Sequence, residues 1–414
     1  MTAMALEIAD PFGMLHPERR KDPYLSYARM HRDGPVHYCE PWEAWLVVRY
    51  SDVIAGFRDQ RLLSARTRQF AAGMSEETRK MMEPLARNLA SWTLFLDAPA
   101  HTRLRGLINK AFTPRMIEAL RPRIRALVEE LLDAARGKER MEIISELANP
   151  LPVIVIGEML GLAREDRHRL KRWSDQLAGL IGTGRPTVEQ VTAALNSIVE
   201  FEAYFRTLIA QRRTQPGNDL LSALVHAEEK GNLLSEQELL STCIMLLFGG
   251  HETTTNLIGN GLLALLRHPE QWELLRGSPE LLPDAVEEFL RYDPPVQFTN
   301  REAGVDMEIA GKAIRKGQRV MLMMAAANRD PAQFKNPDVL DVRREELRHM
   351  TLGMGPHYCV GAALARIEAQ ETFTALMRRF PHMKLEPGVT LDWVDNVGFR
   401  GLLALPVVLG AETR

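Results

Sequence analysis

The longest amphipathic stretch of the sequence runs from Ser235 to Arg267. Apolar side chains recur along it at helical spacing, and Pro269 lies just beyond its end. Ser235 and Glu238 match a capping box, in which each side chain bonds the backbone amide of the other residue. We therefore expect one helix of roughly 32 residues, about 48 Å long, which is enough to cross the molecule.

The centre of this predicted helix differs from its ends. Residues 248–256 include two glycines and three threonines, and each glycine costs about 1 kcal/mol relative to alanine in a helix. Threonine hydroxyls can bond back to preceding carbonyls and bend the helix. A well-capped helix with a weak, polar centre indicates a local opening used for function, where the glycines let a flat ligand approach the backbone.

Between Leu239 and Arg267, Glu252 is the only acid. Taken alone, it fits an ordinary surface glutamate as well as a functional acid. His251-Glu252 also begins like the zinc-binding pattern His-Glu-x-x-His, but Thr255 occupies the place of the second histidine. The segment therefore predicts no zinc site of this kind.

A second informative segment is residues 352–361, in which two glycines and a proline predict a tight loop before Cys359. Helical periodicity follows from about Val360 to Phe380, and Pro381 ends it. Cys359 should thus lie at a helix N-terminus, where the helix dipole and free amide groups stabilise a thiolate. A thiolate is the ligand that a soft or redox-active metal requires.

The other two cysteines, Cys39 and Cys243, are expected to be small buried hydrophobic residues. No Cys-x-x-Cys pair occurs, which argues against a zinc ribbon or a thioredoxin-like site. The odd number and wide spacing of the cysteines favour a reducing compartment over a disulfide framework.

Short strands are predicted at both ends of a chain whose middle is mostly helical, with a turn expected at Gly182–Pro186. Val36–Cys39 and Trp45–Tyr50 are expected to form a hairpin. A meander of short strands is expected at Val305–Ile309, Ala313–Arg315 and Arg319–Met324. Because the strands come from both ends of the chain, we expect one domain over residues 1–414, mainly α with a minor β region.

Composition narrows the classes of function. The chain has 414 residues, 45% of them hydrophobic, and a formal net charge of -2, so a nucleic-acid partner is not expected. The first ten residues lack the apolar core of a signal peptide, and no apolar run approaches the roughly 18 residues that span a bilayer. We expect a cytoplasmic protein without a membrane anchor.

The motifs together resemble the cytochrome P450 family, specifically its soluble bacterial class, over nearly the full chain. Four motifs of the family occur here in the expected order. The propionate-binding stretch matches residues 101–105, and the acid–threonine motif matches residues 249–253. The Glu-x-x-Arg motif matches Glu288 and Arg291, and the haem-binding loop matches at Gly353, Gly355, His357, Cys359 and Gly361. The family usually has phenylalanine where this chain has Leu352. That difference should alter packing around the sulfur, and with it the reduction potential, without affecting ligation.

The resemblance implies the cytochrome P450 fold, with haem b held between the long central helix and the helix after the cysteine loop. Cys359 would ligate the iron, and the haem carboxylates would be bound by His101, Arg105, Arg301 and His357.

It also implies that Thr253 hydrogen-bonds dioxygen while Glu252 relays protons from the solvent; the alternative for Glu252 is a structural salt bridge. Glu288 and Arg291 would form a buried structural ion pair, joined by Arg343.

The substrate pocket implied by the family is mainly apolar, which favours an apolar substrate such as a terpenoid, fatty acid, steroid or polyketide. Each of its expected residues fits the protein core equally well: Trp92, Leu180, Met245, Phe248, Gly249, Val296, Phe298 and Phe399.

Electrons must come from another protein, because no Gly-x-Gly-x-x-Gly fingerprint and no flavin domain is present. We expect a ferredoxin and a ferredoxin reductase. The expected docking face contains Arg343, Arg344, Arg348 and Arg366, which also fit an ordinary solvated basic surface.

The resemblance therefore predicts a haem-thiolate monooxygenase that inserts one oxygen atom of O2 into an apolar substrate, by hydroxylation or epoxidation. Three alternatives remain: a peroxide-driven peroxygenase, a non-catalytic haem sensor, and a helical protein without haem. The acid–threonine pair argues against a peroxygenase, because peroxide brings its own protons and second oxygen.

Overall fold

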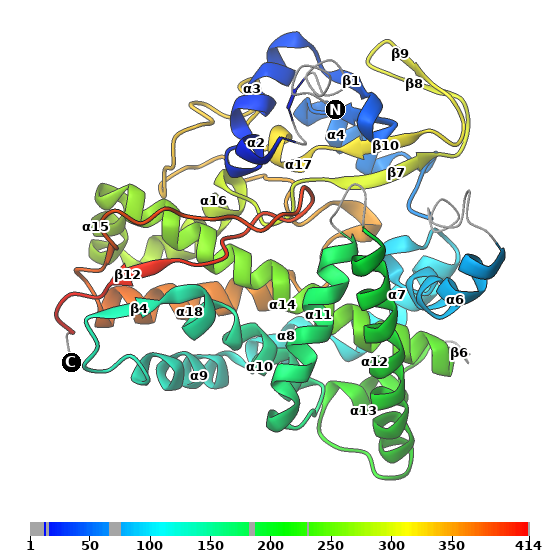
Figure 1. The fold of residues 1–414 in the computed structure, drawn as a ribbon, viewed down its shortest axis with the longest axis horizontal. Coiled ribbons are helices and arrows are strands. Elements are labelled where there is room, and N and C mark those ends of the chain that lie inside the picture. Colours follow the sequence, from blue (N-terminus) through cyan, green and yellow to red (C-terminus); the bar gives the residue numbers. More distant parts are fainter. Residues whose placement is uncertain (1–11, 14–15, 66–75, 182–186, 230–231, 413–414) are drawn as a thin grey trace. The chain divides into compact units, whose positions relative to one another are not determined.

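The computed structural model describes residues 12–13, 16–65, 76–181, 187–229 and 232–412. The expected turn at Gly182–Pro186 lies outside these ranges. Helices predominate among the described residues, with small sheets (Figure 1). The chain forms two compact units: the first comprises residues 1–62, 120–151 and 253–414, and the second comprises 63–119 and 152–252. That the chain is a single domain remains a prediction.

The long helix expected at Ser235–Arg267 is α14, Glu236–Arg267, and it contributes residues to both units. Its capping box is confirmed: the amide of Glu238 donates to Ser235 Oγ over 3.3 Å, and the amide of Ser235 donates to Glu238 Oε2 over 2.8 Å. Local side-chain chemistry thus fixes where this helix begins.

The first unit contains sheet strands, the second half of α14 and several further helices. They are α2 (Pro17–Lys21), α3 (Tyr24–Asp33), α4 (Tyr50–Arg58), α9 (Arg121–Asp133), α15 (Pro269–Gly277), α16 (Leu282–Tyr292), α17 (Met324–Ala327) and α18 (Ala362–Arg379), with single turns η1 (Glu40–Trp42), η5 (Pro279–Leu281) and η6 (Gly355–His357), and a π-helical turn η3 (Ile144–Ala148).

The main sheet has the order β1-β2-β10-β7-β3. Neighbours β1–β2 and β10–β7 are antiparallel and β2–β10 is parallel. Its strands are β1 (Val36–Cys39), β2 (Ala44–Val47), β3 (Leu62–Leu63), β7 (Thr299–Ala303) and β10 (Arg319–Leu322). Smaller sheets contain β4 (Arg140–Glu142), β11 (Lys384–Leu385) and β12 (Pro406–Val408), and β8 (Met307–Ile309) with β9 (Lys312–Ile314).

The second unit is almost entirely helical. Helices α11 and α12 lie side by side as a pair. Its elements are α6 (Glu76–Ala90), η2 (Thr93–Phe95), α7 (Ala100–Ala111), α8 (Pro114–Glu118), η4 (Arg164–Asp166), α11 (Arg167–Ile181), α12 (Val188–Thr214) and α13 (Leu220–Val225), with β5 (Glu228–Glu229) and β6 (Asn232–Leu233); α10 (Pro150–Met159) begins in the first unit. No described helix is long and apolar enough to cross a bilayer.

The strand predictions were right in place and wrong in extent. The second hairpin strand, expected to reach Tyr50, ends at Val47, because the amide of Tyr50 donates to Asp330 Oδ2 over 2.8 Å and α4 begins there. The meander strands lie at β8, β9 and β10, but Met324 already starts α17. A strand at Arg301 was expected only from its distance after Pro294-Pro295, and β7 contains it. Periodicity gives no bounds for this strand, since its sequence Thr-Asn-Arg-Glu-Ala lacks alternating apolar residues.

Candidate active site

The loop before Cys359 is shaped by its glycines. Gly353 and Gly355 have φ angles of +69° and +66°, a left-handed conformation that other residues adopt only with strain. A Cβ on Gly353 would also lie 3.2 Å from the carbonyl oxygen of His357. The loop closes through the amide of Cys359, which donates to the Leu352 carbonyl over 2.8 Å. Since this bond uses the backbone of residue 352, the loop can close with leucine there.

Cys359 is partly exposed, whereas Cys39 and Cys243 are buried. Burial raises the pKa of Cys243 to about 12, so that side chain stays a thiol. Helix α18 begins at Ala362, with Gly361 as its N-cap, so Cys359 precedes the first turn rather than lying within it. A Cβ on residue 361 would lie 4.0 Å from the Cys359 sulfur, and glycine there keeps space beside Sγ. Among the three cysteines, Cys359 is the one suited to bind a metal.

The centre of α14 is accessible although most of the helix is buried. Met245, Gly249, Glu252 and Thr253 are at least partly exposed, at helical spacings of three and four residues, while neighbours such as Leu247 and Thr254 are buried. A Cβ on Gly249 would meet nothing within 4 Å. Open space therefore lies beside the glycine, which fits a flat group that packs against the helix backbone.

Arg301 and His357 lie in the first unit. Arg301, on β7, is 4% exposed; its Nη1 donates to the Asn300 carbonyl over 2.8 Å, and its guanidinium carbon lies 5.7 Å from the centre of the Phe57 ring. His357 is partly exposed in η6, two residues before Cys359. A buried guanidinium and an imidazole near the cysteine loop are donors of the kind that bind carboxylates.

His101 and Arg105 lie one turn apart on α7 in the second unit, and so share a helix face. His101 is 4% exposed, and Arg105 Nε donates to Asn109 Oδ1 over 3.0 Å. Burial and, secondarily, the charge of Arg105 lower the pKa of His101 below its usual value. A neutral His101 beside a permanent cation can still donate through its ring N–H to a carboxylate.

Glu288 and Arg291 form a fully buried ion pair. Arg291 Nε and Nη2 donate to the two Glu288 carboxylate oxygens over 2.6 and 2.8 Å, and both side chains are 0% exposed. Arg291 Nη1 also donates to the Pro337 carbonyl over 2.7 Å. The guanidinium thus joins α16 to residues 328–339.

The prediction that Arg343 joins this ion pair is wrong. Arg344 makes this contact, with Nε 3.1 Å from Glu288 Oε2 and its own donors on the carbonyls of Lys335 and Val339. Arg343 is exposed, and its amide donates to Asp341 Oδ1 over 3.0 Å. A turn from Asp341 to Arg344, closed by the Arg344 amide on the Asp341 carbonyl over 3.0 Å, directs Arg344 rather than Arg343 towards Glu288. Sequence spacing does not resolve this one-position difference.

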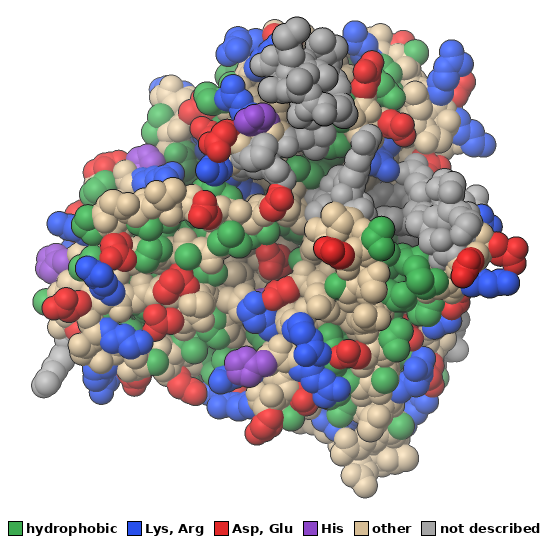
Figure 2. Space-filling view, viewed as in Figure 1, with side chains coloured by type: hydrophobic (Ala, Val, Ile, Leu, Met, Phe, Trp, Pro, Cys, Tyr) green, Lys and Arg blue, Asp and Glu red, His purple; other side chains and the backbone are tan. Residues whose placement is uncertain are grey.

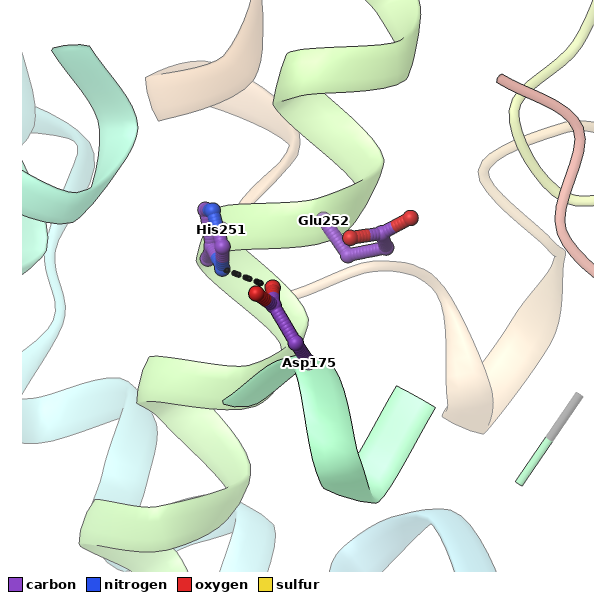
Figure 3. Close-up of side chains that lie close together, drawn as sticks. All are labelled: Asp175, His251 and Glu252. Carbon is purple, nitrogen blue, oxygen red and sulfur yellow. Dashed lines mark ion pairs between the residues drawn. The ribbon is translucent and has the colours of Figure 1, made fainter. Parts of the chain in front are cut away.

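His251, next to Glu252, has partners on α11 that the sequence did not predict. It is fully buried, with Nδ1 3.1 Å from Ser174 Oγ and 3.9 Å from Asp175 Oδ1. In Figure 3 its ring and the Asp175 carboxylate face each other, whereas Glu252 leaves α14 on the other side. Burial and, secondarily, Lys171 lower the pKa of His251 to about 3. The signal in the sequence was a histidine within an apolar helix face.

Asp175, His251 and Glu252 each bring a ligand atom within 4.8 Å of the others, a spacing compatible with a metal ion. The ammonium of Lys171 already lies 2.5 Å from Asp175 Oδ2 and would repel a second cation. We therefore assign this cluster to joining α11 with α14 rather than to metal binding.

The expected pocket residues fall into two sets. In the second unit, Trp92 lies with its ring centre 5.3 Å from that of Phe248, and Met245 Sδ is 3.2 Å from Thr93 Oγ1. Trp92, Phe248 and Leu180 are buried as core residues, and Trp92 Nε1 donates to Asn88 Oδ1 over 2.9 Å. Of this set, Met245 and Gly249 are the accessible members.

In the first unit, Val296 and Phe399 form an isolated antiparallel bridge. Phe298 packs against Trp42, with 5.9 Å between ring centres. Val296 and Phe298 are partly exposed, and Phe399 is 8% exposed. The structure therefore pairs Val296 with Phe399, while Phe298 belongs to the hydrophobic cluster of Trp42.

Comparisons with known proteins match this organisation. The family model described as Cytochrome P450 matches residues 75–396. The chain is 42% identical over 371 residues to cytochrome P450 CYP107DY1 of Priestia megaterium, covering 88% of this chain and 89% of that protein. It is 39% identical over 410 residues to the polyketide biosynthesis cytochrome P450 PksS of Bacillus subtilis, covering 96% and 98%. A crystal structure of P450BioI, in complex with acyl carrier protein ligated to hexadec-9Z-enoic acid, superposes with a TM-score of 0.89 at 38% identity, covering 95% of this chain and 99% of that one.

Proposed function

Because this chain belongs to the cytochrome P450 family and is a haem-dependent monooxygenase, we propose that it binds haem b through Cys359 and oxidises an apolar organic substrate. The observation that carries the proposal is the partly exposed Cys359 in a glycine-shaped loop, together with the open space beside Gly249 in the centre of α14. Both features suit a flat group with a ligand-accepting metal.

His101, Arg105, Arg301 and His357 would hold the haem carboxylates. Their chemistry supports this role, because arginine and histidine are the usual donors to carboxylates and two of the four are almost completely buried. When bound through a thiolate, the haem supplies the activation of dioxygen, since the thiolate donates electron density that favours O–O cleavage.

Thr253 and Glu252 would handle the protons of the reaction. Insertion of one atom of O2 into a substrate releases the other as water, which consumes two protons and two electrons. The Thr253 hydroxyl can accept one hydrogen bond and donate another, so it can hold a proton donor in place, and the accessible Glu252 carboxylate can exchange protons with solvent. Thr253 is the inner group and Glu252 the outer group of this proposed relay.

The substrate would be an apolar molecule with a long chain. Three observations support this: the partly exposed Met245, the apolar pair Val296 and Phe399, and relatives that act in polyketide biosynthesis or bind a fatty acyl chain on a carrier protein. Electrons would come from NAD(P)H through a ferredoxin reductase and a ferredoxin.

The experiment is a comparison of oxidants. Purified protein with hexadecanoic acid is supplied either with NADPH and a surrogate ferredoxin system or with hydrogen peroxide alone. We expect hydroxylated product that depends on O2 and NADPH, with much less from peroxide. Comparable product with peroxide alone would favour a peroxygenase, and haem-loaded protein that turns over neither way, with any of a panel of fatty acids, steroids and polyketide lactones, would favour a haem sensor.

A further inference from the structure

A buried polar network lies behind Val296 and Phe399 in the first unit. The two residues are opposite each other in an antiparallel bridge, so their side chains share one face, and the neighbouring residues Gln297 and Arg400 point to the other face. Three backbone bonds hold this bridge in place: the amide of Gln297 donates to the Gly398 carbonyl over 2.9 Å, that of Arg400 to Pro295 over 2.8 Å, and that of Ala325 to Gln297 over 3.0 Å.

Asp293 and Arg400 form the centre of the network. Arg400 Nε donates to Asp293 Oδ1 over 2.6 Å, and both residues are less than one-tenth exposed. The guanidinium carbon of Arg400 lies 3.5 Å from the centre of the Trp393 ring. The pair therefore joins the end of α16 to the segment that carries Phe399, across 107 positions of sequence.

Helix α3 supplies two tyrosines to the same network. Tyr24 donates its hydroxyl to Asp293 Oδ1 over 2.6 Å, and Tyr27 donates to Gln297 Oε1 over 2.7 Å. Gln297 Nε2 in turn donates to the Pro294 carbonyl over 2.7 Å. Burial and the charge of Asp293 raise the pKa of Tyr24 well above its usual value, so its hydroxyl remains a donor.

Helix α14 is bonded to both segments. Asn260 Nδ2 donates to the carbonyl of Asp293 over 3.2 Å and to that of Arg400 over 3.0 Å. One turn earlier on α14, Asn256 lies close to Gly401. A Cβ on residue 401 would be 1.9 Å from Asn256 Oδ1. Asn256 is three residues after Thr253 on the same helix. The positions of Val296 and Phe399 are thereby tied to the helix that carries the proposed relay.

The network is not itself a ligand site. The pocket beside Tyr27, Gln297 and Arg400 has a volume of about 20 Å³, and this is room for about one water molecule. Its polar groups are instead bonded to one another and to backbone carbonyls. Asn260 Oδ1 is the exception, since it is buried without a hydrogen-bond partner among the described residues. Buried groups connected in this way hold a unique geometry rather than add much stability.

We infer that the Asp293–Arg400 pair, with Tyr24, Tyr27, Gln297 and Asn260, determines substrate selectivity by setting the position of Val296 and Phe399. These are positioning residues, because they act through the two apolar side chains. The inference rests on the proposed function, in which Val296 and Phe399 contact the substrate. A shift of either side chain by a fraction of an ångström changes which chain length fits the apolar surface, and one methylene can change discrimination about tenfold or more.

The test uses the haem-loaded full chain with Tyr24→Phe and Asp293→Asn, each of which removes or weakens one contact to the centre of the network. The matched control is Tyr204→Phe, which removes a similar bond, from Tyr204 to Asp166 Oδ2 over 2.8 Å, in the second unit. Spin-state titrations give dissociation constants for dodecanoic and hexadecanoic acids. Hydrogen exchange gives the protection of the backbone amides of residues 296–298 and 396–400.

We expect both network variants to lower the hydrogen-exchange protection of the two segments together. For Tyr24→Phe the protection factor should fall about fivefold, because one hydrogen bond is lost. The ratio of the two dissociation constants should change by a similar factor. Tyr204→Phe should leave the exchange of these segments and the ratio unchanged. Unaltered protection in the network variants, or lower protection with an unaltered ratio, would overturn the inference. If wild-type protein binds neither acid, the proposed substrate class fails, and hydrogen exchange still decides whether the network holds the two segments.

Discussion

Thr253 is a partly exposed residue on a helix whose neighbouring residues are mostly buried, and Thr254 beside it is 3% exposed. The two threonines have the same chemistry and nearly the same place in the chain. Only the accessible one can meet a ligand that packs against Gly249. The two neighbouring threonines therefore provide a matched test of the role proposed for Thr253.

We predict that Thr253→Ala uncouples electron use from product formation. Loss of the hydroxyl removes the inner group of the relay, so reduced oxygen leaves as hydrogen peroxide while NADPH consumption continues. Product per NADPH should fall by about tenfold or more, near the lower end of what positioned proton transfer contributes. Product, peroxide and NADPH are measured together.

The control for this prediction is Thr254→Ala, which should keep most of the coupling of the wild-type protein. Equal coupling in Thr253→Ala and wild type would remove Thr253 from the relay.

At the scale of elements, the ion pair of Glu288 and Arg291 joins α16 to the segment 328–344. Glu288→Gln leaves the buried Arg291 and Arg344 without their carboxylate. We predict a loss of about 3–5 kcal/mol in the free energy of unfolding, because an unpaired buried charge is costly. Urea unfolding followed by circular dichroism measures it.

Glu273→Gln is the matched control. It breaks the exposed pair of Glu273 and Arg276, and surface pairs contribute only about 0–1 kcal/mol. Equal, small losses in the two variants would show that Glu288 is not the centre of this junction.

A second element-scale prediction concerns the junction of α11 and α14. The pKa of His251 is about 3 in the folded protein and about 6.5 when unfolded. Between these values the unfolded chain binds the extra proton, so the stability contributed by neutral His251 is complete above pH 6.5 and decreases as the pH falls towards 3.

His251→Gln should remove this contribution to the acid slope, by up to about 1.4 kcal/mol per pH unit. Unfolding free energies at several pH values between 4 and 7.5 test it. The exposed His168 on the adjoining α11 provides the control, since His168→Gln should leave the slope as it is. An unchanged slope in His251→Gln would mean that His251 is protonated in the folded protein or shielded in the unfolded one.

At the scale of the whole molecule, acidic and basic side chains are interspersed on the face shown in Figure 2, as the net charge of -2 suggests. Of the four arginines expected to form a docking face, Arg344 is paired with Glu288, and Arg366 Nε lies 2.6 Å from Glu287 Oε1. Arg343 and Arg348 are exposed. The available positive charge is thus smaller than the sequence suggested.

We predict that Arg348→Gln slows reduction by a surrogate ferredoxin roughly threefold at low salt, with less effect at high salt, because exposed charges mainly affect the rate of encounter and are screened by ions. Stopped-flow reduction at two ionic strengths measures this. Arg136→Gln, another exposed arginine, should leave the rate unchanged. Salt-insensitive reduction of the wild-type protein would contradict electrostatic docking.

Sequence patterns predicted what is local. The capping box located the start of α14, and the glycines located the loop before Cys359. They failed where distant segments decide the outcome: the bounds of β7 follow from its pairing with β10, and Arg344 rather than Arg343 reaches Glu288 because of the turn from Asp341 to Arg344. The pairing of Asp293 with Arg400 spans 107 positions, and no periodicity reports it.

The proposed function depends most on the ligand of the haem iron, and a spectrum of the reduced, carbon monoxide-bound protein tests that ligand directly. We predict a strongly red-shifted Soret band in wild type, its loss in Cys359→Ser, and its retention in Cys243→Ala, since Cys243 is a buried thiol. A wild-type spectrum without that band, or an unchanged band in Cys359→Ser, would contradict thiolate ligation by Cys359.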